Sequence, residues 1–246
     1  MRKTPLPLII VLSLIVRPWP SVAQQGRYLY KATLVQAAPG KILEVIDLFQ
    51  TISNEMKQAG TQAPLCMRHS QGDRWDLLLL FPMGSYGDYY GREKVGRRDT
   101  NEPLSVPAQK LKQDVSWQED VFVYGPPLQE LRKAFDAAGF FHVEMFQSLP
   151  GKQAELYRER DQENLYSRAL KQPENLIFVR DQGAAWDLFT IGCFRDLKHY
   201  AEAADVSQKD QDAAAKAAGF ESASQIGPYL RTLISLHHDT LAVAVK

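Results

Sequence analysis

Two side chains capable of acid–base chemistry stand two positions apart in the 246-residue chain, at His142 and Glu144. They fall in residues 140–147, a stretch that predicts a β-strand. Side chains two apart in a strand project from the same face, so His142 and Glu144 are expected to lie side by side. A carboxylate beside an imidazole makes a candidate acid–base pair. The same pattern is also typical of a solvated sheet face or a structural ion pair.

Two further polar residues, Lys31 and Thr33, occupy the matching positions of an earlier predicted strand, residues 28–36. We expect Lys31, Thr33, His142 and Glu144 to face an opposite sheet and to line one polar cavity, or to face solvent if no barrel forms. The residues of the other parity are apolar and are expected to face the helices: Tyr30, Ala32, Leu34, Phe141, Val143 and Met145.

Two more histidines are candidate ligand-binding residues, because a neutral imidazole ligates haem or a metal readily. His199 precedes Tyr200 on a predicted helix, and His237 continues an apolar stripe through Leu230 and Leu233, so its side chain is expected to point inward. No pair of histidines has the His-x-x-x-His spacing of a metal site, and no Cys–His cluster is present. No metal site is therefore predicted, and a structural role is the commoner explanation for each single histidine.

An internal duplication positions these candidates. Trp75-Asp76-Leu77 returns as Trp186-Asp187-Leu188, and the same offset relates Pro39-Gly40-Lys41 to Pro150-Gly151-Lys152. The alignment needs no insertion between Gln36 and Tyr89, which indicates two copies of one folding unit. Because the Trp-Asp pair occurs in both halves, we interpret the tryptophans as core or strand-end packing and the aspartates as fold-stabilising residues.

Each half has the predicted order strand, helix, strand, strand, helix, strand, which is the split βαβ or ferredoxin-like unit. The predicted strands are residues 28–36, 64–69, 75–81 and 117–124 in the first half, and 140–147, 175–180, 185–193 and 240–245 in the second. We therefore predict a first repeat at residues 24–125, a linker helix within 126–139 and a second repeat at 140–246. Residues 91–107 are expected to form an irregular excursion.

The long helices of the two halves differ in polarity. The first has an apolar stripe that includes Phe49 and Ile52, whereas Arg160 and Glu163 take those places in the second. Arg160 and Glu163 either line a pocket that the first half lacks or lie on a solvated helix with i,i+4 ion pairs. Of the two, the solvated helix is the commoner pattern.

Residues 1–23 predict a cleaved signal peptide and hence a secreted or periplasmic protein. Arg2 and Lys3 precede an apolar run at residues 6–16, and the small residues before the predicted cut after Ala23 suit a signal peptidase. An uncleaved membrane anchor is the alternative. In an oxidising compartment Cys66 and Cys193 could pair, or they could remain buried free thiols.

The charge pattern excludes some partners. The 29 basic side chains are balanced by 29 acidic ones, and no basic stripe predicts nucleic-acid binding. After the predicted signal, no segment is apolar enough to cross a membrane. Neither a Gly-rich phosphate loop nor a nucleophile elbow is present, so no catalytic residue is predicted.

The duplicated unit resembles the dimeric α/β-barrel superfamily, which includes antibiotic-biosynthesis-monooxygenase-like and NIPSNAP-like domains. The resemblance covers residues 27–246 and depends on element order and the repeat. It implies an α+β fold in which two tandem ferredoxin-like repeats form a pseudo-dimer, with their sheets face to face within one chain. It also implies binding of a small apolar or aromatic molecule, and haem in some members.

We therefore predict a secreted or periplasmic protein, a monomer or homodimer, that binds a small apolar or aromatic molecule without a required cofactor. The alternative is a cofactor-independent or haem-linked monooxygenase-like enzyme that uses a cavity around His142, Glu144 or His199.

Overall fold

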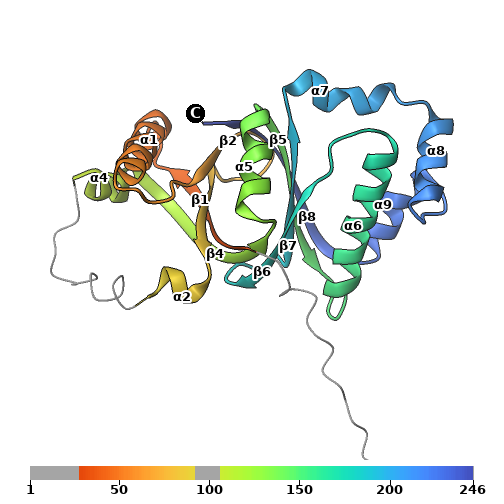
Figure 1. The fold of residues 1–246 in the computed structure, drawn as a ribbon, viewed down its shortest axis with the longest axis horizontal. Helices are drawn as coiled ribbons and strands as arrows, with labels where there is room; N and C mark the ends of the chain where they lie inside the picture. Colours follow the sequence, from red (N-terminus) through yellow and green to blue (C-terminus); the bar gives the residue numbers. More distant parts are fainter. Residues whose placement is uncertain (1–27, 92–105, 246) are drawn as a thin grey trace, which may run out of the picture.

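The computed structural model describes residues 28–91 and 106–245. The strands form a closed antiparallel barrel in the order β1-β3-β2-β8-β5-β7-β6-β4 (Figure 1). The first repeat contributes β1 (Tyr28–Ala37), β2 (Leu65–Gln71), β3 (Leu77–Gly84) and β4 (Val115–Gly125). The second contributes β5 (Phe140–Ser148), β6 (Leu176–Gln182), β7 (Leu188–Phe194) and β8 (Ile234–Ala244).

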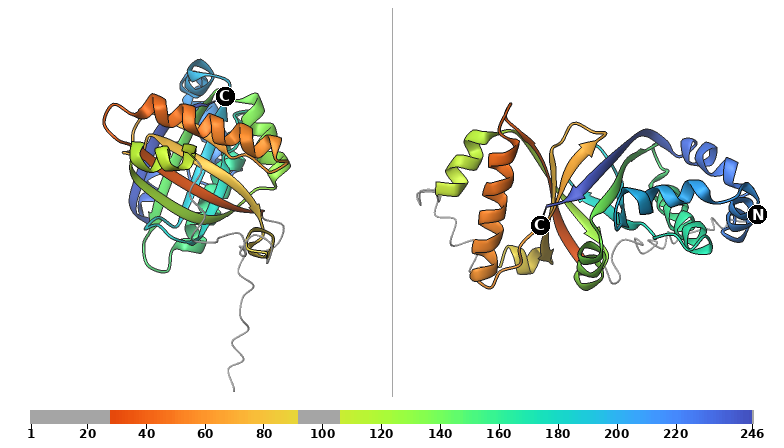
Figure 2. Two further views of the ribbon diagram at one scale, coloured as in Figure 1. Left: turned by 90° about the vertical axis from the view of Figure 1, so that its left-hand side faces the viewer. Right: turned by 90° about the horizontal axis from the view of Figure 1, so that it is seen from above.

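Apart from α5, the helices lie on two opposite sides of the barrel (Figure 2). In the first repeat they are α1 (Ile42–Gln58), α2 (Tyr86–Tyr89) and α4 (Val106–Asp114), and α5 (Leu128–Ala137) lies in the predicted linker. In the second they are α6 (Gln153–Ala169), α7 (Leu197–Ala201), the 3-10 helix η1 (Glu202–Asp205), α8 (Gln208–Ala217) and α9 (Ala223–Arg231). The prediction of two ferredoxin-like repeats joined as a pseudo-dimer is confirmed.

The repeats are joined through their sheet edges. β2 pairs with β8 and β4 pairs with β6, so each repeat supplies one strand to each of the two seams. Because hydrogen bonding continues around the ring, the barrel has no free edge. β1 and β5 are the corresponding central strands, and the strand order places them on opposite sides of the barrel.

The recurring aspartates have the fold role that the sequence predicts. Asp76 Oδ2 accepts a hydrogen bond from the Ala37 backbone N–H at 2.8 Å, and Asp187 Oδ2 accepts one from the equivalent Ser148 N–H at 2.9 Å. Each aspartate therefore ties the end of its repeat's first strand to the start of its third.

The barrel interior is a shared apolar core, which corrects the predicted orientation of two strands. Tyr30, Ala32 and Leu34 of β1 and their counterparts Phe141, Val143 and Met145 of β5 fill the interior instead of facing the helices. Residues of the other parity face the helices: Val35 packs in the cluster under α1, and Phe146 in the cluster under α6. Both faces of this barrel wall are buried, so apolar character alone did not distinguish inside from outside.

The last strand is longer than predicted. β8 begins at Ile234 instead of residue 240, so His237 and His238 lie within a strand and not at its junction with a helix. Its polar residues did not suggest a strand, but β8 pairs with β5 on one side and β2 on the other. Neighbouring side chains in a strand point to opposite faces, which separates His237 from His238.

The two cysteines are free. Cys66 packs against the cluster under α1, whereas Cys193 packs against the barrel interior. Burial raises the pKa of each thiol to about 12, so both are poor nucleophiles.

The predicted signal peptide at residues 1–23 and most of the predicted excursion at 91–107 lie outside the described residues. No helix in the described part of the chain has the length and apolarity needed to cross a bilayer.

Candidate functional site

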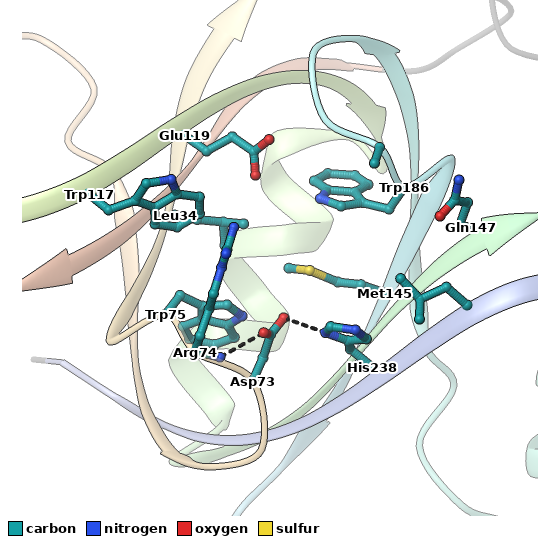
Figure 3. A pocket seen from close by; sticks show the side chains of 12 residues that line it. Leu34, Asp73, Arg74, Trp75, Trp117, Glu119, Met145, Gln147, Trp186 and His238 are labelled. Atoms are coloured by element: carbon teal, nitrogen blue, oxygen red, sulfur yellow. Dashed lines mark hydrogen bonds and ion pairs between the residues drawn. The ribbon is translucent and has the colours of Figure 1, made fainter.

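A cavity of about 330 Å³ opens at one end of the barrel (Figure 3). The other end is covered by α5, whose Leu131 and Phe135 belong to the interior core. The strand register separates the ends, because Tyr28 pairs with Gly125 next to α5 while Gln36 pairs with Trp117 at the cavity. The lining comes from both repeats: Leu34, Asp73, Arg74, Trp75, Trp117, Glu119, Met145, Gln147, Ala185, Trp186, Leu236 and His238.

Three tryptophans dominate this barrel-mouth pocket. Trp75 and Trp186 occupy equivalent positions of the two repeats, and Trp117 stands at the start of β4. Within the described residues, the indole N–H groups of Trp75 and Trp186 are buried and have no hydrogen-bond acceptor. Both indole nitrogens lie on the side of the ring that faces the space between the two tryptophans (Figure 3). A buried donor without an acceptor costs free energy, and an acceptor on a ligand would recover it.

Four charged or titratable side chains, Asp73, Arg74, Glu119 and His238, line parts of the pocket (Figure 3). The Arg74 guanidinium lies 4.5 Å from the centre of the Trp117 ring. His238 Nδ1 and Asp73 Oδ2 are 3.0 Å apart, which fixes the orientation of the imidazole at the pocket wall. Glu119 adds a second carboxylate. The pocket thus combines apolar aromatic walls with a few polar groups, as small-molecule sites usually do.

The sequence-predicted site residues lie elsewhere, on the outer faces of the barrel. His142, Glu144 and His237 come together with Asp239, and we call these four residues the outer-face cluster. His142 Nε2 is 3.1 Å from Asp239 Oδ1, and His237 Nε2 is 3.2 Å from the same oxygen and 3.5 Å from Glu144 Oε1. The His237 side chain is 10% exposed and stacks on Phe146 at 4.8 Å, so it is buried between the sheet and the helices of the second repeat and does not face the barrel interior.

Helix α6 supplies a buried arginine above the outer-face cluster. Arg160 is 2% exposed and makes two hydrogen bonds to Glu159, at 2.6 and 2.7 Å, and one to Glu163 at 2.6 Å. Its Nη1 lies 3.7 Å from Glu144 Oε1, and its guanidinium lies 4.8 Å from the Phe146 ring centre. The interpretation of Arg160 on a solvated helix is therefore wrong. The helix turns this face to the sheet, where Arg160 meets Glu144 and the two carboxylates of its own helix, Glu159 and Glu163.

The ionisation of these groups follows from their contacts. The carboxylate of Asp239, followed by that of Glu144, raises the pKa of His237 to about 9. Burial opposes ionisation of Glu144, but His237 and Arg160 together hold the pKa of Glu144 below its usual range. Burial and the neighbouring carboxylates of Glu159 and Glu144 raise the pKa of Glu163 to about 7.

Lys31 and Thr33 do not share a cavity with His142 and Glu144. Thr33 Oγ1 donates a 2.6 Å hydrogen bond to Asp120 Oδ1, and Lys31 Nζ lies 3.5 Å from Asp120 Oδ2. The expected common cavity is wrong, because these side chains point outward from β1 and β5 on opposite sides of the barrel.

His199 is also apart from the outer-face cluster. Its Nδ1 accepts a 3.2 Å hydrogen bond from the Arg195 N–H, and its own N–H donates to Asp196 Oδ1 at the start of α7. His199 therefore lies in the first turn of α7, where Asp196 is the N-cap residue.

Sequence reasoning missed the barrel-mouth pocket. Trp75 and Trp186 were assigned to packing, and Trp75 is indeed 1% exposed within the core. The available signal was that all three tryptophans beyond residue 23 lie beside predicted strand ends. Only the closure of the barrel, however, brings those ends together.

No protein-family model matches the chain, and a comparison with curated proteins finds no match. Solved structures do match over nearly the whole length. An anthrone oxidase-like protein superposes with a TM-score of 0.54 at 12% identity, covering 91% of this chain and 93% of its own. The chain has the dimeric α/β-barrel fold.

Two further structures of this fold are proposed monooxygenases. The one from Lactobacillus acidophilus NCFM has a TM-score of 0.52 at 8% identity, covering 89% of this chain and 95% of its own. The one from Fusobacterium nucleatum has a TM-score of 0.52 at 10% identity, covering 91% and 94%. At these identities the likeness is one of fold, and it confirms the predicted superfamily fold.

Proposed function

We propose that the protein binds a small, flat aromatic molecule with oxygen acceptors in the barrel-mouth pocket. The observation that supports this most directly is the pair of buried indole N–H groups, of Trp75 and Trp186, that lack an acceptor inside an aromatic-walled cavity. A carbonyl or phenolic oxygen placed between the two rings would accept from them.

The pocket's size and walls agree with such a ligand. Its volume of about 330 Å³ is at the lower end of the range for small-molecule sites. Aromatic rings attract one another in offset or edge-to-face arrangements, so the tryptophans favour a flat ring system. Arg74, stacked on Trp117, would favour a ligand with a negative or strongly polar substituent.

Tricyclic anthrones and anthraquinones are the first ligands to test. They are flat and bear carbonyl oxygens, and one structure with the same fold is that of an anthrone oxidase-like protein. Their size also suits a compact pocket that has contributions from both repeats.

Turnover is the second candidate function, and the pairing of His238 with Asp73 favours it. An imidazole oriented by a carboxylate is a general base. It would take a proton from an anthrone-type ligand and leave an electron-rich anion that reacts with molecular oxygen. Oxidation of the ring CH₂ to a carbonyl supplies four electrons to O₂, so that one oxygen atom enters the product and the other leaves as water. This is the cofactor-independent monooxygenase-like activity that the superfamily resemblance implies.

Haem is not part of the proposed function. The space between β5 and α6, where His142 and His237 would have to present a ligand, is filled by Arg160, Glu159 and Phe146. Both histidines also face carboxylates. The residues present do not fit a haem in this position.

We further propose that the protein acts outside the cytoplasm, on the basis of the signal-like residues 1–23. Secretion with a mature N-terminus at Gln24, read by mass spectrometry, is the expected result. An intact N-terminus on the cell-associated protein would contradict it.

Ligand binding can be read from tryptophan fluorescence, because the three tryptophans beyond residue 23 all line the pocket. Titration with 1,8-dihydroxyanthrone and with anthraquinone-2-sulfonate is expected to quench the emission saturably. Trp75→Phe and Trp186→Phe each keep an aromatic wall but remove one unpaired donor, so each should weaken binding about 3- to 10-fold.

Trp117→Phe is the matched control, because Trp117 lies in the same pocket but is not one of the two unpaired donors. It should leave affinity within about twofold. The proposal fails if no probe quenches saturably, or if all three variants weaken binding alike. Oxygen uptake with 1,8-dihydroxyanthrone that is lost in His238→Gln, with binding retained, would support turnover.

A further inference from the structure

We propose that the outer-face cluster is a binding site for one divalent transition-metal cation, ligated by His142, Glu144, His237 and Asp239. The site belongs to the second repeat and lies on the other face of the barrel wall from the barrel-mouth pocket. The metal site does not depend on the proposed function. His237 belongs to the outer-face cluster, whereas its neighbour His238 faces the barrel-mouth pocket on the opposite side of β8.

The donor atoms converge on one small volume. The ligand atoms of His142, Glu144 and Asp239 all lie within 4.8 Å of one another, the only such group found in the described part of the chain. The fourth donor, His237 Nε2, is 3.2 Å from Asp239 and 3.5 Å from Glu144. Modest closure around a central cation would bring imidazole nitrogens and carboxylate oxygens to ordinary metal–ligand distances.

His237 is the observation that distinguishes this cluster from a surface group of acidic residues. Its side chain is nine-tenths buried, and its Nε2 makes no hydrogen bond to any described residue although two carboxylate oxygens lie nearby. A buried ring nitrogen directed between two carboxylates is arranged as a ligand is.

The local charge also favours an added cation. Four carboxylates surround this region, those of Glu144, Glu159, Glu163 and Asp239, whereas Arg160 is the one fixed cation described among them and His237 is a cation only while it is protonated. A metal ion would balance the remaining negative charge in a place where water screens it poorly.

Neighbouring groups hold the ligands in place. Thr190 Oγ1 donates a 3.0 Å hydrogen bond to Glu144 Oε2, the Phe146 ring stacks on His237, and the Tyr200 ring lies 5.4 Å from that of His142. Supporting contacts of this kind orient metal ligands. Arg231 Nη1 lies 3.4 Å from His237 Nδ1, and its exposed side chain can turn away when Nδ1 takes the proton.

The donor set indicates the class of cation. Two imidazoles with two carboxylates suit first-row ions such as Zn²⁺, Fe²⁺, Co²⁺ or Mn²⁺ better than Ca²⁺ or Mg²⁺, which prefer oxygen ligands alone.

The test uses untagged protein and two metals, at mildly alkaline pH because ligating imidazoles must be unprotonated. Co²⁺ binding is followed by its visible absorption, which reports imidazole and carboxylate ligation, and Zn²⁺ binding by calorimetry. One equivalent per chain is expected. His237→Gln and Asp239→Asn should each weaken binding by at least tenfold and reduce the cobalt absorption.

Asp120→Asn is the matched control, because Asp120 contacts Lys31 and Thr33 on the outer face of the first repeat as Asp239 contacts His142 in the second. It should leave binding unchanged. If His237→Gln does not fold, as judged by circular dichroism, His142→Gln and Asp239→Asn decide the question, since Asp239 is 54% exposed. Absence of one-to-one binding, or equal affinity in the cluster variants and the control, would overturn the site.

Discussion

The two repeats pack an apolar cluster between sheet and long helix, but the second repeat places buried ionic groups in part of that space. Under α1, Phe49 and Leu79 form part of an apolar cluster. At the equivalent positions under α6 stand Arg160 and Thr190, next to Glu144. The same backbone unit therefore accommodates either apolar or ionic side chains at these equivalent positions.

The strands that pair with β1 and β5, namely β4 and β8, also differ in polarity between the two repeats. Asp120 and Asp239 occupy equivalent register positions, since Thr33 of β1 pairs with Asp120 and Glu144 of β5 pairs with Asp239. The position two before each aspartate is Gln118 in the first repeat and His237 in the second. The first repeat has the same fold without these ionic groups, so they are not required for the fold. This agrees with the rule that buried ion pairs rarely stabilise a protein more than apolar packing does.

The largest loss of stability is expected from removing Arg160, the arginine at the centre of the buried ionic groups. Arg160→Met leaves Glu159 and Glu163 buried without their cation, which should cost about 3–5 kcal/mol of unfolding free energy. Urea denaturation measures the loss. Arg158→Met, on the exposed side of the same helix, is the control and should change stability by less than about 0.5 kcal/mol. A loss below 1 kcal/mol for Arg160→Met would mean that the carboxylates are not held as described.

A smaller loss of stability is expected when either of the equivalent aspartates is replaced, and the two losses should differ. Asp187 accepts from the Ser148 N–H and Oγ–H and pairs with Arg180, whereas Asp76 accepts from the Ala37 N–H. Asp76→Ala removes one hydrogen bond to a charged group and is expected to cost about 1.5–3 kcal/mol, and Asp187→Ala, which removes three such contacts, is expected to cost more. Thermal and urea unfolding of the pair give the ranking. Equal losses would show that the extra bonds of the second repeat contribute little.

The smallest effect depends on pH. Because the pKa of Glu163 is raised to about 7 in the folded protein, its ionisation lowers stability as pH rises from about 4.5 through about 7. Glu163→Gln removes that cost, so the variant should gain about 1–2 kcal/mol at pH 8 and almost nothing at pH 4.5. Denaturation at both pH values checks the sign, with the exposed Asp161→Asn as control. A variant that loses stability at pH 8 would contradict it.

The sequence predicted the fold well because the duplication is carried by residues with strong local roles. Asp76 and Asp187 each bond the end of a neighbouring strand, so their spacing reflects a requirement of the backbone. The orientation of β1 and β5 could not be obtained in the same way. Both faces of a closed barrel covered by helices are apolar, and periodicity separates the two faces without saying which is inside.

The sites were predicted only in part. His142, Glu144 and His237 do meet, but their partner Asp239 was overlooked because β8 was expected to begin after it. The barrel-mouth pocket needed residues from β1, β4, β5 and β8 and from the segments before β3 and β7. Those segments become neighbours only through strand pairing between the repeats, which local sequence patterns do not reveal.

The joining of both halves in one chain has a consequence at the barrel mouth. In a barrel made from two identical subunits, any residue near the symmetry axis appears twice, and the opening presents the same chemistry from either side. Here Asp73 and Arg74 stand opposite Ala184 and Ala185, their counterparts in the other half. The opening is thus asymmetric, since the turn before Trp75 presents two charged side chains where the turn before Trp186 presents two alanines, and an elongated ligand would enter in a single orientation.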